Sequence, residues 1–456
     1  MYQALLIFDL EDMAFVLTSV LTSLLAGLAA AGPSSSASSP ACTLNGQLPS
    51  PTPSDFHFSG NVRKYYIAAE EIDWDYAPSG WDNWLSVPVK NSPRADAGDY
   101  NDFSIGTKWR KAVYRGYTDA TFSQRSVQPA WQGIQGPTMR AEVGDLVEIL
   151  FVNRLSTHYA SMHSMGLSYS KDNEGAVYEF ANETVRGDAV PPKGGCWVYK
   201  WVVPESAAPN HNEPAMMHAY HSYVSMQEDL NAGLLGPQIT YQRGKMAETM
   251  ARYREFPVLL QGTDESKSMF GAVNARREGR RNVTVDYEKT FSELRQYGNE
   301  SVWKPQMTTL LSSLKFDDAP TFYSMNGYVL GNLPPFEMSL GDKVIWFVYG
   351  MLSGHRFELC SLSWEKLTPQ ARVMTPIRSI CTAMASRTTA CVRPPCVSVN
   401  SVIYHFVVSH ANRIAVIPGT MATLYMNATM PGRWQVVCHI NEHISKGMVG
   451  WYTVSQ

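Results

Sequence analysis

The sequence has almost no excess of one charge, since 38 Lys and Arg stand against 41 Asp and Glu and give a formal net charge of −3. Nucleic-acid-binding domains concentrate positive charge on one surface, so this balance excludes nucleic acid as a partner. Long hydrophobic runs are also scarce. Only residues 14–31 form one, and no other run is long enough to span a bilayer. Any membrane association therefore depends on that single segment.

The run at 14–31 ends in three alanines and is followed by Ser/Pro-rich sequence. A small-residue cleavage pattern after an apolar run predicts a secretory signal peptide at 1–31. The residues before Met13 include three acids and no Lys or Arg, so a start at Met13 would give a more ordinary signal. The alternative is an uncleaved membrane anchor. The Ser/Pro-rich composition predicts a disordered leader at 32–61.

Cysteines are few, and their number, seven, is odd. If Cys438 binds a metal, six remain that can form disulfides, although the sequence does not give their connectivity. Sequons for N-glycosylation agree with a secretory route. The four sequons begin at Asn182, Asn282, Asn299 and Asn427.

Two stretches of the chain share one design and predict two similar β units. Residues 143–153 read VGDLVEILFVN and residues 340–349 read LGDKVIWFVY, so each has a Gly-Asp turn before a β-branched and aromatic run. The 23 Tyr, 12 Trp and 27 Pro also suit a β-rich protein with many turns. We predict an all-β protein with domains at 62–243 and 300–456 and an interdomain segment at 244–299.

Residues 431–448 read PGRWQVVCHINEHISKGM and form the most informative stretch. Cys438, His443 and Met448 follow one another at five-residue intervals. A mononuclear copper site takes a Cys and two His in a trigonal plane with a weak axial Met, so this spacing suits copper with a second His from elsewhere. The alternative is a buried free cysteine near a surface histidine and a core methionine. The offset of the Gly-Met pair and the β-rich flanks favour copper.

This stretch resembles the last copper loop of the ceruloplasmin and hephaestin family of multicopper ferroxidases. That loop reads roughly P-G-x-W-x-x-H-C-H-x-x-x-H-x-x-x-G-M, and this chain departs from it only at Val437. Residues 63–78, 136–153 and 322–333 also resemble the family. The resemblance implies two cupredoxin-like Greek-key β-sandwich domains. It also implies copper as the cofactor.

The resemblance further implies a trinuclear copper cluster, bound by eight histidines, that reduces dioxygen to water. Half of these positions keep a histidine, namely His163, His221, His405 and His439. The other half are replaced, by Met165, Tyr223, Ile403 and Val437. Tyr and Met can bind copper, but Val and Ile cannot, so we expect a degraded oxygen site. A relay from Cys438 to His439 survives.

The second histidine of the mononuclear site has several candidate positions. Aligned with the family's His-rich strand, Asn400 takes its position, while His355 and His410 are other candidates. An atypical insertion near 358–399, which contains four of the seven cysteines, interrupts the resemblance just before this strand. We expect either a genuine inserted loop or a misassembled coding segment.

Ferroxidases also place carboxylates beside the mononuclear copper, because hard oxygen ligands bind ferrous iron and stabilise the ferric product. Glu442 and Asp318 match the acidic positions of the family, and a family histidine five residues after the second is Tyr323 here. The alternative for each acid is a solvated surface charge.

The sequence therefore predicts a secreted multicopper oxidoreductase that takes electrons from ferrous iron, with dioxygen as the acceptor. The alternative function is a non-enzymatic copper-binding or interaction glycoprotein built on the same domains, as in coagulation factors five and eight. The number of coppers and the oligomeric state are left open.

Overall fold

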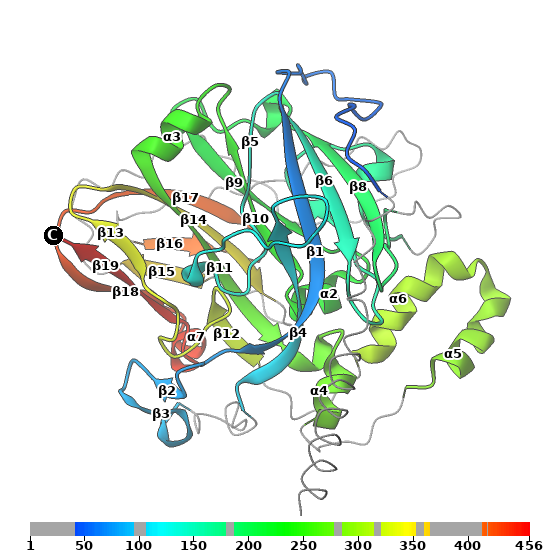
Figure 1. Ribbon diagram of the computed structural model, residues 1–456. Helices are drawn as coiled ribbons and strands as arrows, with labels where there is room; N and C mark the ends of the chain where they lie inside the picture. Colours follow the sequence, from blue (N-terminus) through cyan, green and yellow to red (C-terminus); the bar gives the residue numbers. More distant parts are fainter. Residues whose placement is uncertain are drawn as a thin grey trace, which may run out of the picture. The chain divides into compact units, whose positions relative to one another are not determined.

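The computed structural model describes residues 42–94, 106–178, 187–277, 285–313, 321–352, 360–364, 413–416 and 418–456. Within these ranges the chain forms four sheets of four or five strands, a two-stranded ribbon and a few short helices (Figure 1). The predicted all-β class is confirmed. None of the helices in the described ranges is both long and apolar enough to cross a bilayer.

The first pair of sheets is built from strands between residues 62 and 241. One sheet has the order β4-β1-β6-β8 and the other has the order β5-β10-β9-β7. Strand β1 pairs in parallel with β6, and β5 pairs in parallel with β10, whereas the other pairings are antiparallel. The strands are β1 Val62–Asp75, β4 Lys108–Tyr117, β5 Met139–Glu142, β6 Leu146–Asn153, β7 His163–Ser164, β8 Gly195–Val202, β9 Ala215–His221 and β10 Leu235–Tyr241.

The second pair of sheets repeats this plan. Its sheets have the orders β12-β11-β14-β17 and β13-β19-β18-β15-β16, and β11 pairs in parallel with β14 as β1 does with β6. Gly144 and Gly341, which precede β6 and β14, have φ values of 93° and 89°, which explains the glycine in both turns. The strands are β11 Tyr253–Asp264, β12 Thr321–Met325, β13 Phe336–Ser339, β14 Lys343–Leu352, β15 Cys360–Trp364, β16 Arg413–Val416, β17 Met421–Asn427, β18 Gly432–Cys438 and β19 Val449–Ser455.

The remaining elements connect these strands. The ribbon consists of β2 Trp81–Asp82 and β3 Val87–Pro88. The helices are α2 Met226–Ala232, α3 Met246–Arg252, α4 Gly271–Arg277, α5 Tyr287–Leu294, α6 Glu300–Ser312 and α7 Asn441–Ser445.

The segment 244–299, for which the sequence predicts an interdomain connection, contains the strand β11. This strand lies between β12 and β14, so the second pair of sheets begins at Tyr253 and not near residue 300. Pro257 hides the strand in the sequence, because proline lacks a donor for the ladder and argues against an inner strand. The division into two domains stays a proposal, with its boundary moved to the stretch between β10 and β11.

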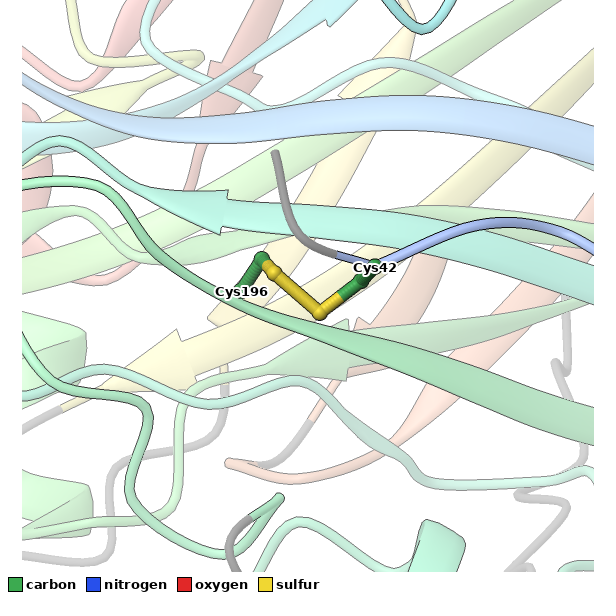
Figure 2. Close-up of a disulfide and its surroundings, with 2 residues drawn as sticks. All are labelled: Cys42 and Cys196. Atoms are coloured by element: carbon green, nitrogen blue, oxygen red, sulfur yellow. A yellow bond between two sulfur atoms is a disulfide. The ribbon is translucent and has the colours of Figure 1, made fainter. Parts of the chain in front are cut away.

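The predicted disorder at 32–61 is wrong for the part that the structure describes. Cys42 forms a disulfide with Cys196 on β8, across 154 residues (Figure 2). The backbone N–H groups of Asn45 and Gly46 donate to the buried carboxylate of Glu148. A covalent link and charge-assisted hydrogen bonds therefore hold a segment whose Ser/Pro composition suggests a free chain. The signal peptide predicted at 1–31 lies outside the described residues.

An apolar layer joins the two pairs of sheets. Strands β9 and β10 of the first pair pack against β11, β14 and β17 of the second. Its fully buried members include Ile239, Leu259 and Phe347. Burial of one such side chain contributes about 1.5–3 kcal/mol, so the layer contributes a large share of the stability.

A buried ion pair also joins the two pairs of sheets. The Lys111 ammonium on β4 donates to the Glu265 carboxylate just after β11, at 2.8 Å, and their side chains are 1% and 0% exposed. Lys111 also donates to the Asn231 carbonyl, and the Tyr76 hydroxyl donates to the same Glu265 oxygen at 2.6 Å. Removal of one partner would therefore leave an uncompensated buried charge.

Lys111→Met is expected to lower the free energy of unfolding by about 3–5 kcal/mol, because the Glu265 carboxylate loses its counter-ion. The double variant Lys111→Met/Glu265→Gln should recover part of this loss, since the amide still accepts from Tyr76. Urea unfolding of the four members of the cycle measures the coupling. Lys245→Met, which removes an exposed ion pair, is the control and should change stability by less than about 1 kcal/mol. Additive losses in the cycle would contradict the proposed coupling.

A second expectation concerns pH. Burial lowers the pKa of His158 from 6.5 to about 4, and neither ring nitrogen has a hydrogen-bond partner. The unfolded chain therefore binds this proton first as the pH falls, and stability is lost between about pH 6.5 and pH 4. His158→Phe should reduce the loss between about pH 7.5 and pH 5 by about 2 kcal/mol, measured by urea unfolding. The exposed His211, changed to Gln, is the control, and an unaltered pH dependence in His158→Phe would refute the assignment.

Candidate metal centre

The loop between β18 and β19 holds the three copper ligands predicted from the sequence. Cys438 is the last residue of β18, His443 lies in the single-turn helix α7, and Met448 directly precedes β19. The Cys438 N–H donates to the Met448 carbonyl at 3.2 Å, and the Met448 N–H donates to the His443 carbonyl at 3.0 Å. Two backbone hydrogen bonds therefore tie the three residues to one another.

The side chains of Cys438 and His443 meet inside the protein. The Cys438 Sγ lies 3.5 Å from the His443 Nδ1, and Cys438, His443 and Met448 are 0%, 1% and 0% exposed. Two ligands about 2 Å from one metal lie no more than about 4 Å apart, so this separation suits a shared metal. Cys438 is not in a disulfide. A buried thiol, imidazole and thioether are the donor set of mononuclear copper, and the residues present therefore fit that group.

Several neighbours fix the loop around His443. The Tyr323 ring, on β12, stacks on the imidazole with centroids 4.2 Å apart and planes inclined by 22°. Arg94 donates to the Ile444 carbonyl at 2.9 Å. Gly447 has φ of 91°, and a Cβ there would lie 2.7 Å from the Leu330 nitrogen, so only glycine fits. Such supports orient a ligand before any metal arrives.

Glu442, one of the two predicted iron-binding acids, lies beside His443 at the surface. Its side chain is 41% exposed, and it pairs with Lys446 at 3.6 Å. The Tyr323 hydroxyl donates to it at 3.4 Å. The sequence prediction missed Lys446, although a lysine four residues after a glutamate on a helix is a recognisable pair. The other acid, Asp318, lies outside the described residues.

His163 and His221 come together from two strands. They are directly opposite each other in the β7–β9 ladder, with ring centroids 5.4 Å apart. The Nδ1 of His163 donates to the Glu174 carbonyl at 2.8 Å, and that of His221 donates to the Ser222 carbonyl at 2.7 Å. Burial lowers the pKa of His163, and burial together with the neighbouring His163 lowers the pKa of His221 to about 4. Both rings are therefore neutral at neutral pH.

Comparison with known proteins adds an independent line of evidence. Residues 408–456 match the family model described as multicopper oxidase. Mouse hephaestin is 28% identical over 403 residues, covering 87% of this chain and 30% of that protein. Human ceruloplasmin is 28% identical over 408 residues, covering 88% and 32%. The mouse protein named ferroxidase HEPHL1 is 27% identical over 405 residues, covering 86% and 29%.

The chain is similar to the hephaestin and ceruloplasmin family over most of its own length. Copper, the predicted cofactor, is the cofactor of these multicopper oxidases. The chain spans about a third or less of the length of each of these relatives. Among solved structures, one titled as a multicopper oxidase is 15% identical with a TM-score of 0.47, covering 86% of this chain and 89% of that one.

The family's oxygen-reducing cluster fits the described residues poorly. The Val437 side chain is buried and apolar, and its backbone faces Val449 in the β18–β19 ladder. Met165 packs into the apolar layer between the two pairs of sheets. His439 is exposed just after β18. In the described ranges, no group of three or more His, Cys, Asp and Glu is arranged to hold a metal.

The remaining predicted ligands cannot be placed. His405, Asn400, His355 and His410 all lie outside the described residues, as does the predicted insertion except for β15. The second imidazole of the mononuclear site is therefore still a prediction.

Copper loading should give the protein a strong absorption near roughly 600 nm, from charge transfer between a thiolate and cupric copper. Cys438→Ser should abolish this band. Met448→Leu should largely keep it and raise the reduction potential, because an axial ligand tunes the potential more than it binds. Spectrophotometric copper titration and redox titration measure both effects. Met430→Leu, at an exposed methionine, is the control, and a band that survives in Cys438→Ser would refute the ligand assignment.

Proposed function

We propose that this chain is an extracellular multicopper oxidoreductase that oxidises ferrous iron at a mononuclear copper held by Cys438, His443 and Met448. The observation that supports the proposal most strongly is the 3.5 Å distance between the Cys438 Sγ and the His443 Nδ1, two buried side chains in a loop whose ends are joined by backbone hydrogen bonds. Bound there, copper would supply a one-electron acceptor. The family relationship supports the same class of reaction, since one relative is named a ferroxidase.

Glu442 is the proposed iron-binding group. Its carboxylate is the exposed neighbour of a buried candidate ligand, so an iron ion bound there would lie close to the His443 imidazole. A hard anionic oxygen prefers the ferric product to the ferrous substrate, which favours loss of an electron. Lys446 and the Tyr323 hydroxyl hold the carboxylate in place before iron arrives. Asp318 would be the second acid.

Dioxygen is the proposed final electron acceptor, and the path toward it would start at Cys438. The adjacent His439 is bonded to it through the backbone, which gives a short covalent route out of the mononuclear site. His163, His221 and His405 are the other proposed oxygen-site ligands. Because the replaced positions weaken this site, we expect slow reoxidation by dioxygen.

An extracellular setting is supported by the chemistry of the surface. The Cys42–Cys196 disulfide belongs to an oxidising compartment. The sequon residues Asn299 and Asn427 are exposed, so both are accessible to N-glycosylation. Asn182 and Asn282 lie outside the described residues.

The test is anaerobic addition of ferrous iron to the copper-loaded protein. The absorption near roughly 600 nm should bleach as copper is reduced, and admission of air should restore it slowly. Glu442→Gln should slow bleaching by iron about tenfold, which corresponds to about 1.4 kcal/mol, and leave the absorption itself unchanged. Glu337→Gln, at an exposed acid on β13, is the matched control.

Bleaching by ascorbate separates the outcomes. If ascorbate reduces the copper but iron does not, iron is not the substrate and the copper site stands. If the protein binds no copper, the oxidoreductase proposal fails and the non-enzymatic interaction glycoprotein replaces it.

A further inference from the structure

Three rings form a compact group at the end of the β7–β9 ladder. The ring centroids of His163 and His221 are 5.4 Å apart, and the ring of Tyr223 lies 5.2 Å from the first and 5.6 Å from the second. Tyr223 follows His221 by two residues, just beyond the end of β9, and forms an isolated parallel bridge with Ala176. His163 faces them from the neighbouring strand.

Hydrogen bonds fix the protonation of both imidazoles. A carbonyl oxygen can only accept, so the Nδ1 atoms of His163 and His221 must hold the protons that they donate to Glu174 and Ser222. The Nε2 atom of each ring therefore has a lone pair available for a ligand. A metal-binding histidine typically has this arrangement, with one nitrogen hydrogen-bonded and the other on the metal.

The spacing of the rings suits one metal ion. A metal about 2 Å from Nε2 lies about 3 Å from the centre of that ring, so two imidazoles on one metal have centroids no more than about 6 Å apart. The observed 5.4 Å is within this limit. A phenolate oxygen bound to the same metal places that metal about 4 Å from the centre of the tyrosine ring, so the tyrosine and histidine centroids lie no more than about 7 Å apart. The centroid distances of 5.2 and 5.6 Å from Tyr223 to the two imidazoles are within this limit.

We propose that His163, His221 and Tyr223 bind a single copper(II) ion through two Nε2 atoms and a phenolate oxygen. The family resemblance implies part of a three-copper cluster at this place. Met165, which replaces one histidine of that cluster, packs in the apolar layer, so we assign a single copper to the three remaining side chains. Binding breaks the phenol O–H bond and forms an O–Cu bond, and the proton passes to solvent. The inference rests on the proposed function for the identity of the metal, but it does not require the cysteine site.

The experiment uses the full chain with Cys438→Ser, freed of metal by a chelator and titrated with copper(II) sulfate. One copper should bind with a visible phenolate-to-copper charge-transfer band, and electron paramagnetic resonance should show coupling to two imidazole nitrogens. Adding Tyr223→Phe should remove the band and keep the nitrogen couplings. Adding His221→Gln should weaken binding at least about tenfold, the change expected when a well-placed ligand is lost.

Tyr169→Phe is the matched control, because that ring also lies 5.5 Å from His163 but packs against the core of the first pair of sheets. It should leave the phenolate band unchanged. A band that persists in Tyr223→Phe, or copper binding that is unaffected by His221→Gln, would overturn the inference. Circular dichroism of each variant must match the parent, and Tyr223→Phe keeps the ring and so provides the decisive comparison.

The wild-type protein distinguishes the two proposals. A thiolate band without a phenolate band supports the mononuclear site at Cys438 and overturns this inference. A phenolate band without a thiolate band supports this inference and overturns the ligand set on which the proposed function rests.

Discussion

The apolar layer between the two pairs of sheets is the constraint on which the rest of the structure depends. Strand β10 is buried along its whole length and β14 is buried from Val344 to Met351, so neither pair of sheets has a solvent-facing side at the layer. Separation would expose many large aliphatic and aromatic side chains at about 1.5–3 kcal/mol each. Each half is therefore stable in this form only with the other packed against it.

Both candidate metal sites depend on that layer without being part of it. His221 is the last residue of β9, which contributes Ala215, Met217 and Ala219 to the layer. Tyr323 lies on β12, which pairs with β11 of the layer. Polar contacts then fix the alignment of the two halves, including the buried pair of Lys111 and Glu265. The Trp74 indole also donates across to the Gly327 carbonyl at 2.7 Å. A rigid scaffold of this kind can hold ligand side chains in place before a metal binds.

The sequence was most informative where the relevant contacts are local. Cys438 and His443 could be paired from their spacing, because a short loop between adjacent antiparallel strands brings its ends together. The histidines His163 and His221 could be selected by resemblance, but their direct opposition depends on strand register, which a single sequence does not specify. Tyr223 was identified from the sequence as a replaced histidine position whose side chain can bind copper, but its distance from two imidazoles is a tertiary property that the sequence does not give.

Two predictions from the sequence were wrong because the deciding contacts lie far apart in the chain. Strand β11 was hidden by Pro257, whose lack of an N–H argues against an inner strand, and tertiary packing overrode that local signal. The stretch after Cys42 was read as disordered because composition does not reveal a disulfide partner 154 residues away. In both segments, pairing with residues far away in the sequence determined the structure, and local propensity did not.

The disulfide has a further consequence for the thiol chemistry of the chain. Cys42 and Cys196 are oxidised, whereas Cys438 keeps its thiol, so the same oxidising surroundings must act on one set of sulfurs and spare another. Thiol–disulfide exchange needs direct attack by a thiolate on sulfur, and the fully buried Cys438 is out of reach of such a reagent. Folding of the second pair of sheets thus protects the thiol, and a chain that met oxidants before this folding step would lose its proposed copper ligand to a wrong disulfide.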